Sequence, residues 1–173
     1  MNVNQCPLMA VSSHSDSNNS MTETVVCVGA VVLKGDRVLL VRQAKGHSLE
    51  GQWTIPWGRI NSGESPSGAV LRETREEGGI TAEIQGLLGV QEIPAPWEGQ
   101  IGIVYLCRHV DGEPEPDDHE TDAARYLSGE DIETLGEPVE PLSKWLTNRI
   151  LRGQYTLTRD EATNPFSPSV GYL

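Results

Sequence analysis

The first patterned segment of the chain is an almost unbroken apolar run. Residues 24–33 (TVVCVGAVVL) are mostly β-branched, with no regular polar positions, which predicts a strand buried on both faces of a sheet. Lys34-Gly35-Asp36 is a turn signal, and residues 37–42 (RVLLVR) resume the apolar pattern, so the two runs are expected to form a hairpin. Residues 46–60 are predicted to be a loop, and further strands are predicted at residues 84–90, 101–110 and 124–127.

Two helices are predicted from their terminal residues and from their periodicity. Ser65 is a good N-cap, Pro66 suits the first helical position, and Gly78-Gly79 supplies a stop, so a helix is expected between them. A second helix is predicted to begin at Pro141. Its amphipathic pattern consists of Leu142, Trp145, Leu146, Arg149 and Ile150, which recur at helical spacing.

The order of these elements places the chain in the α/β class. Strands in runs of two, together with two substantial helices, predict a mixed sheet covered by helices, an α/β sandwich. At 173 residues the chain fits one domain with modest tails. We expect this domain over residues 23–152, after a disordered, polar leader at residues 1–22 and before a loosely held tail at residues 153–173.

The chain is strongly acidic, with 13 Lys and Arg against 25 Asp and Glu and a net charge of −12. Few cations are available to pair with phosphates, so neither a nucleic acid nor an anionic membrane is an expected partner. No apolar stretch reaches the ~20 residues of a membrane span, and the first twenty residues do not resemble a signal peptide. We therefore expect a soluble, cytoplasmic protein, in which a divalent cation would supply the positive charge for any phosphorylated ligand.

Three glutamates gather on one side of the first predicted helix. With Glu73 set at zero on a helical wheel, Glu76 falls at about −60° and Glu77 at about +40°. Arg72 stands next to Glu73 and four residues before Glu76, close enough to help fix the carboxylates. Taken alone, this arc is more often a solvated acidic surface, and the alternative is a cradle for Mg²⁺ or Mn²⁺, which prefer carboxylate oxygens.

The full pattern around the helix decides between these readings. From Gly58 the chain runs GRINSGESPSGAVLRETREEGGI: a glycine, five residues, Glu64, seven residues, and then Arg-Glu-Thr-Arg-Glu-Glu-Gly-Gly-Ile. This segment, residues 58–80, resembles the Nudix box, with Thr74 at a position that is usually apolar. The order of elements from about residue 24 to 151 also resembles the Nudix domain and its α/β/α sandwich with a mixed sheet.

The resemblance implies a hydrolase that splits a diphosphate linkage with the help of divalent cations. Carried over to this chain, Glu73, Glu76 and Glu77 become the main metal ligands, and Arg72 holds Glu73 in place. Glu73 or a neighbouring acid such as Glu76 could also orient or deprotonate the attacking water. The backbone carbonyl of Trp57 is a further metal ligand. A second glycine is commoner at that position, and the indole is expected to narrow the site. A late loop often adds another catalytic acid, for which Glu120 is the candidate, with Asp118 and Asp122 as its rivals.

Residues outside the box point less directly to the substrate. Some ADP-ribose-cleaving members carry a proline about fifteen residues after the box, and Pro94 and Pro96 stand in that region, where they could equally be loop stiffeners. Trp97 and Trp53 are candidates for stacking on a base, the alternative for each being ordinary packing. Arg42 is a further candidate for substrate binding.

The expected activity is hydrolysis of a small nucleoside diphosphate derivative, such as ADP-ribose, with Mg²⁺ or Mn²⁺. A nucleoside triphosphate pyrophosphohydrolase that removes oxidised nucleotides is the nearest alternative. A third reading is a non-catalytic, nucleotide-sensing Nudix domain, although such proteins often lose acids of the box. The sequence leaves open whether the chain acts as a monomer or as a homodimer.

Overall fold

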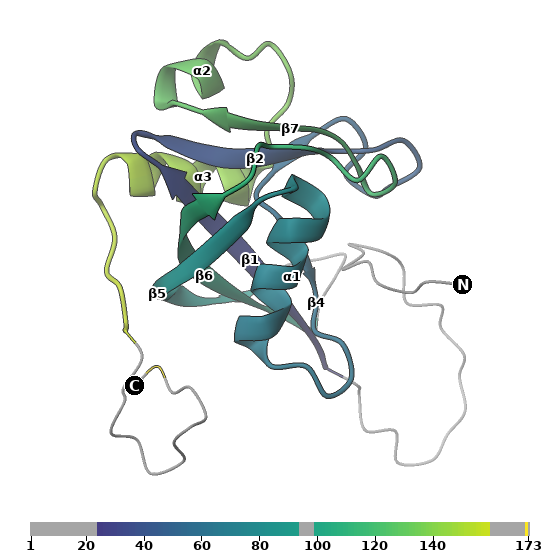
Figure 1. Cartoon of the computed structure of the whole chain (residues 1–173), viewed down its shortest axis with the longest axis vertical. Helices are drawn as coiled ribbons and strands as arrows, with labels where there is room; N and C mark the ends of the chain where they lie inside the picture. The colour runs from purple at the N-terminus through teal and green to yellow at the C-terminus, as the bar shows by residue number, and fades with distance from the viewer. Residues whose placement is uncertain (1–23, 94–98, 160–171, 173) are drawn as a thin grey trace.

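The computed structural model describes residues 24–93, 99–159 and 172. Within them, seven strands form one sheet, in which the path β3-β2-β1-β6-β5 is joined by β4 beside β1 and β7 beside β2 (Figure 1). β1 and β6 pair in parallel, whereas the other pairs are antiparallel, so the sheet is mixed as predicted. The strands are β1 (Val25–Lys34), β2 (Arg37–Gln43), β3 (Trp53–Thr54), β4 (Trp57–Arg59), β5 (Thr81–Glu92), β6 (Gln100–Asp111) and β7 (Thr121–Leu127).

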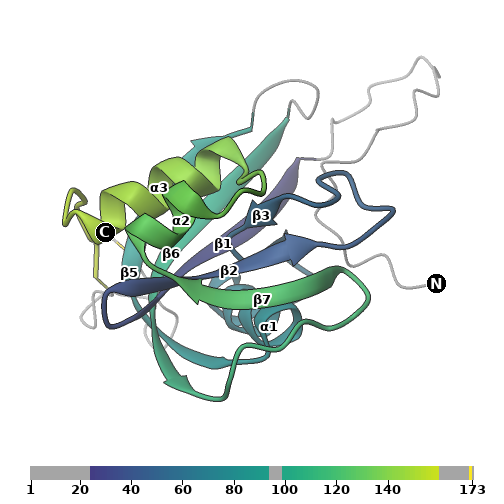
Figure 2. The same cartoon turned by 90° about the horizontal axis from the view of Figure 1, so that it is seen from above.

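Helices cover the sheet on both sides. Figure 2 shows α1 (Pro66–Gly78) beneath the sheet and α2 (Gly129–Thr134) with α3 (Pro141–Leu151) above it. Accordingly, α1 packs on β1, β4 and β5, while α3 contacts β2, β3 and α2. The predicted α/β/α sandwich is confirmed.

The two faces of β1 explain its unbroken apolar sequence. Val28, Ala30 and Val32 belong to the core cluster on the α1 side, whereas Val31 belongs to the cluster that includes Ile150 of α3. Successive side chains of a strand point to opposite faces, and here each face has a helix layer to bury it. A strand in this position needs apolar residues at every place, as the sequence has.

The ends of α1 are those predicted. The Ser65 hydroxyl accepts a hydrogen bond from the backbone N–H of Gly68 at 3.0 Å, which satisfies one of the free donors of the first turn. At the other end, Gly79 adopts φ 71° and its N–H donates to the Arg75 carbonyl at 3.1 Å. This left-handed conformation is one that glycine adopts without strain. The helix that carries the acids is therefore held at both ends.

The second predicted helix is present, but its buried side differs from the apolar stripe. Ser143 and Thr147 are buried together with Ile150, whereas Trp145 is 53% exposed. The small side chains let α3 lie close to the sheet, where the Ser143 hydroxyl accepts a hydrogen bond from the Ile55 N–H at 3.1 Å. The predicted loop at residues 46–60 was also partly wrong, because β3 and β4 lie within it.

Three described residues of the C-terminal tail contact the rest of the domain. The N–H of Leu87 donates to the Thr158 carbonyl at 2.7 Å, and the N–H of Thr158 donates back to Leu87 at 3.0 Å. Leu157 packs on the α3-side cluster, while the Tyr172 ring lies 5.5 Å from that of Tyr105, in the α1-side cluster. Within the described residues these contacts join Thr158 to the middle of β5 and Tyr172 to Tyr105 of β6, and the expectation of a loosely held tail over residues 153–173 stays a prediction.

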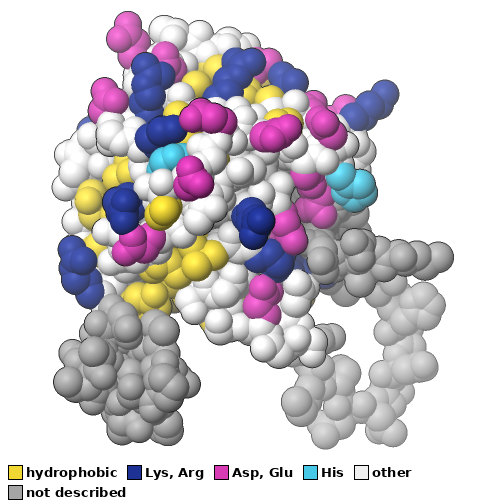
Figure 3. All heavy atoms as spheres, viewed as in Figure 1, with side chains coloured by type: hydrophobic (Ala, Val, Ile, Leu, Met, Phe, Trp, Pro, Cys, Tyr) yellow, Lys and Arg dark blue, Asp and Glu magenta, His cyan; other side chains and the backbone are white. Residues whose placement is uncertain are grey.

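Two findings bear on the expected partners. On the face shown in Figure 3, Lys and Arg side chains are interspersed with Asp and Glu, so this face offers no continuous basic surface to a phosphate backbone. Of the helices in residues 24–93 and 99–159, none has the length and apolar character needed to cross a membrane.

Candidate active site

The acidic cradle begins with two buried carboxylates on the inner side of α1. The side chains of Glu73 and Glu77 are each 2% exposed, whereas Glu76 reaches solvent. Gly58 of β4 makes room for the first of them: a Cβ atom built there would lie 1.9 Å from the carboxyl carbon of Glu73. The glycine that opens the box is therefore required by the position of the box's central glutamate.

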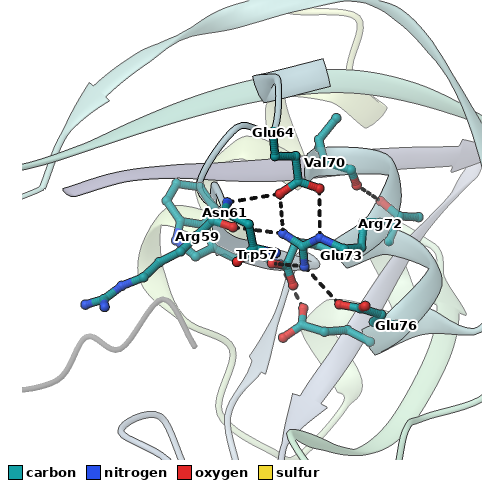
Figure 4. Close-up of polar contacts among 10 residues, drawn as sticks. Trp57, Arg59, Asn61, Glu64, Val70, Arg72, Glu73 and Glu76 are labelled. Atoms are coloured by element: carbon teal, nitrogen blue, oxygen red, sulfur yellow. Dashed lines mark hydrogen bonds and ion pairs between the residues drawn. The ribbon is translucent and has the colours of Figure 1, made fainter. Parts of the chain in front are cut away.

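Arg72 links three of the glutamates (Figure 4). Its Nε and Nη2 donate to the two oxygens of Glu64, both at 2.9 Å, and its Nη1 donates to Glu73 at 2.7 Å and to Glu76 at 2.9 Å. Nη2 also donates to the Arg59 carbonyl at 2.9 Å. These bonds use all five N–H donors of the guanidinium, so Arg72 is held in one orientation and holds the acids around it.

Glu77 lies deeper and has a different partner. Its Oε2 accepts a hydrogen bond from the backbone N–H of Trp57 at 2.8 Å. Burial raises the pKa of Glu77 well above its usual value, and the nearby charge of Glu73 raises it further. Burial also raises the pKa of Glu73 to about 7, even though Arg72 acts in the opposite direction. Both carboxylates are thus poorly solvated as anions.

The loop before β7 brings one more acid to this cluster. Burial, followed by the charge of Asp117, raises the pKa of Glu120, whose own charge in turn contributes to the raised pKa values of Glu73 and Glu77. Asp117 shapes the loop by accepting hydrogen bonds from the N–H groups of His119, Glu120 and Thr121. Sequence reasoning had not singled out Asp117.

Neither rival of Glu120 occupies the same position. Asp118 is exposed, with φ 56°, and the Asp122 carboxylate pairs with Arg42 at 2.7 Å. The Thr121 hydroxyl donates to the Glu77 carbonyl at 3.0 Å and so fixes the loop against α1. The geometry therefore favours Glu120 over the two aspartates.

This donor set fits a hard divalent cation in its chemistry. Glu64, Glu73 and Glu76 share the single charge of Arg72, and within the described chain neither Glu77 nor Glu120 has an ion pair. Clustered carboxylates that lack compensation are what Mg²⁺ or Mn²⁺ binds. No three acidic, His or Cys side chains of the described residues already stand together as a metal-binding group. The metal-binding role of these glutamates stays a prediction.

The residues predicted to contact the substrate do not all lie at the site. Trp53 is completely buried, its Nε1 donates to Glu137 at 2.5 Å, and the guanidinium groups of Arg42 and Arg125 lie 5.9 and 5.4 Å from its ring centre. Its indole has no face left for a base, so the packing alternative holds for Trp53. Arg42 is occupied by Asp122 and by Glu137, the latter at 2.8 Å. Trp97, Pro94 and Pro96 lie outside the described residues.

A cavity of about 510 Å³ lies beside the cradle, with Trp57 in its wall. Sequence reasoning missed most of its lining, because these residues form no motif and come from strands and a helix that are distant in sequence. The feature of the sequence that could have indicated them is a group of uncharged amide and hydroxyl side chains near the ends of the predicted strands. The polar lining includes Gln43, Gln52, Gln91, Gln100, Thr54 and Ser143.

The fold is an α/β/α sandwich. In it, a central glutamate packs against a glycine, an arginine is hydrogen-bonded to three glutamates, and one side of the helix carries buried acids. Together these features are those of a Nudix-type domain. A family model for the NUDIX domain matches residues 23–146, and the chain belongs to this family. The resemblance found in residues 58–80 is thereby confirmed.

Particular relatives are similar over part of the chain. An ADP-ribose pyrophosphatase of Methanocaldococcus jannaschii is 32% identical over 90 residues, covering 51% of this chain and 53% of that protein. The 8-oxo-dGDP phosphatase NUDT18 of Homo sapiens is 34% identical over 87 residues, covering 50% and 26%. The chain thus spans about a quarter to about half of these curated relatives. The crystal structure of a MutT NUDIX hydrolase from Burkholderia pseudomallei matches with a TM-score of 0.64 and 27% identity, covering 75% of this chain and 99% of that one.

Proposed function

We propose that this protein hydrolyses a diphosphate linkage in a small nucleoside diphosphate derivative, with ADP-ribose as the leading example, and that it requires Mg²⁺ or Mn²⁺. The observation that carries the proposal is the pair of buried glutamates on α1, Glu73 and Glu77, next to Glu120; of these three, only Glu73 forms an ion pair with Arg72 among the described residues. A bound cation would offset the charge of this cluster and of a diphosphate, and would make a coordinated water more acidic.

The residues of this chain have distinct parts in that reaction. Glu73, Glu76 and Glu77, with the carbonyl of Trp57, would hold the cation, while Arg72 keeps Glu73 and Glu76 in position. Glu120, whose pKa is raised by burial, would accept a proton from the attacking water. A carboxylate whose pKa is raised toward neutrality is a better general base than an ordinary exposed one.

The names of the relatives support a nucleoside diphosphate unit in the substrate. One is an ADP-ribose pyrophosphatase and another an 8-oxo-dGDP phosphatase. The second name also keeps oxidised nucleotides as the alternative substrate class. A purely sensing role is less favoured, because every acid and the arginine of the box are present, and Arg72 donates hydrogen bonds to Glu64, Glu73 and Glu76.

A product assay distinguishes these substrates. The purified chain is incubated with ADP-ribose, 8-oxo-dGDP or 8-oxo-dGTP and Mg²⁺ or Mn²⁺, and products are separated by anion-exchange chromatography. AMP with ribose 5-phosphate supports the proposal, whereas 8-oxo-dGMP with pyrophosphate supports the triphosphate alternative. Metal-dependent binding of the nucleotides without any product would indicate a sensing domain.

A further inference from the structure

Trp57 lies between the acidic cradle and the neighbouring cavity. Its backbone N–H donates to Glu77 at 2.8 Å, so the residue is fixed to the cradle through its main chain. Its side chain lines the cavity of about 510 Å³. The pattern of the box more often has glycine at this place. The indole is therefore a feature of this chain that the general role of the box does not require.

Two glycines provide the seat for this indole. A Cβ atom built on Gly29 would lie 2.1 Å from Cε3 of Trp57, and one built on Gly102 would lie 2.4 Å from its Cη2. The benzene part of the indole thus covers the neighbouring strands β1 and β6 where both lack a side chain. Any larger residue at either position would displace the ring, so the sheet fixes the ring's place in the cavity wall.

The cavity lining is suited to an uncharged group. None of the described residues that line it is Lys or Arg. Its charged member, Glu140, is engaged at the start of α3, where its carboxylate accepts hydrogen bonds from the N–H groups of Leu142 at 2.8 Å and Ser143 at 2.7 Å. A phosphate group would find no cationic partner in this lining.

Amides and apolar side chains together form much of the remaining wall. Gln52 and Gln91 contribute to it together with Ile55 and Ile93. A glutamine amide carries two N–H donors and an acceptor oxygen, which match the edge of a nucleobase. The Gln91 amide uses one N–H for the Glu92 carbonyl at 2.6 Å and has a second N–H and its oxygen besides. An indole offers an aromatic face on which any base can stack.

We propose that Trp57 is the platform on which the base of the nucleotide stacks. The uncharged edge of the base would lie among the glutamine amides, and the diphosphate of the nucleotide would lie at the acidic cradle. This inference rests on the proposed function and names the part of the site that binds the nucleoside. Trp57 would then be a positioning residue, since its ring sets where the base lies and its backbone is bonded to the acid beside the reacting group. Its ring would contribute to affinity more than to the chemical step.

Binding without turnover tests the platform directly. AMP, added in the presence of EDTA, is expected to quench tryptophan fluorescence, whereas ribose 5-phosphate, which has no base, is expected to leave it unchanged. The quenching should disappear in Trp57→Phe and persist in the matched control Trp145→Phe, because Trp145 lies on the outer side of α3. Equal quenching by ribose 5-phosphate, or quenching that survives in Trp57→Phe, would overturn the proposal.

Kinetics of the metal-loaded protein separate positioning from a structural role. Loss of a stacked base costs about 1–3 kcal/mol in other proteins, so Trp57→Ala should raise KM about tenfold or more and change kcat little. Trp57→Phe, which keeps an aromatic face, should return KM to within about threefold of the original value. A fall in kcat with unchanged KM, or no change in either, would contradict the assignment.

The two tests also keep this inference distinct from the proposed function. If AMP quenches through Trp57 but no diphosphate is split, the proposed hydrolysis fails and the base platform stands. If ADP-ribose is split and Trp57→Ala has an unchanged KM, the hydrolysis stands and the platform is wrong.

Discussion

The seat of Glu73 over Gly58 leads to a sharp prediction for the substitution Gly58→Ala. The added methyl carbon would lie 1.9 Å from the carboxyl carbon and from Oε1 of Glu73, and 2.3 Å from its Oε2. Because these distances are far shorter than any non-bonded contact, the carboxylate of Glu73 has to move away. Its hydrogen bond from Arg72, at 2.7 Å, would be lost with it.

The size of the effect follows from these two changes. Forcing an extra methyl into a packed site costs about 1–3 kcal/mol, and losing a charge-assisted hydrogen bond costs about 1.5–3 kcal/mol. Part of this is returned, because burial disfavours the charged form of Glu73 and the displaced carboxylate gains water. We expect a net loss of about 2–4 kcal/mol, or about 4–16 °C in the midpoint of thermal unfolding.

Gly89→Ala is the matched control, since a Cβ atom built on that glycine meets nothing within 4 Å. Both variants are measured by thermal unfolding, and their uptake of Mn²⁺ by calorimetry. Gly58→Ala should unfold earlier and bind Mn²⁺ weakly, while Gly89→Ala should match the unchanged protein in both. If the two variants behave alike, Gly58 is not the seat of a metal-binding carboxylate.

Three further predictions concern the same cluster. Glu77→Gln should lower turnover by orders of magnitude, whereas Glu133→Gln, on exposed α2, should not; equal rates would remove Glu77 from the mechanism. Arg72→Lys should lower kcat more than tenfold, because a lysine cannot reproduce the paired bonds to Glu64; an unchanged kcat would show that the hub is dispensable. In EDTA, the pKa of Glu73 near 7 means that the folded chain holds a proton that the unfolded chain releases above about pH 4.5. Stability should therefore fall by about 3 kcal/mol as pH rises from 4.5 to 7. Denaturant unfolding of Glu73→Gln should lack that decrease, and an equal slope in the variant would refute this origin.

Those parts of the molecule that depend on local spacing could be predicted from the sequence. The arc of Glu73, Glu76 and Glu77 follows from helical geometry alone, and Ser65 and Gly79 mark the helix ends by their own backbone chemistry. The unbroken apolar run of β1 likewise required cover on both faces. The residues of the box lie on β4, on the loop that follows it, and on α1 and its C-terminal end, which are consecutive in the chain, so their arrangement depends on local geometry.

Features that depend on distant contacts could not be predicted. Trp53 and Trp57 stand in one short segment with similar neighbours, yet the first is enclosed by α3-side packing and the second lines a cavity. The burial of Ser143 and Thr147 reflects how closely α3 approaches the sheet, which its own sequence does not show. The choice of Glu120 over Asp122 depends on Arg42, a residue eighty positions earlier than its aspartate partner.

The pairing of Thr158 with Leu87 has a consequence for the molecule in concentrated solution. β5 ends the path of the sheet, and a terminal strand offers unpaired N–H and C=O groups on which another chain could add a strand. The protein's own backbone takes up two of those groups at the middle of β5. The tail thereby occupies the middle of β5, where a strand of another molecule could otherwise pair, and this effect is separate from the chemistry of the acids on α1.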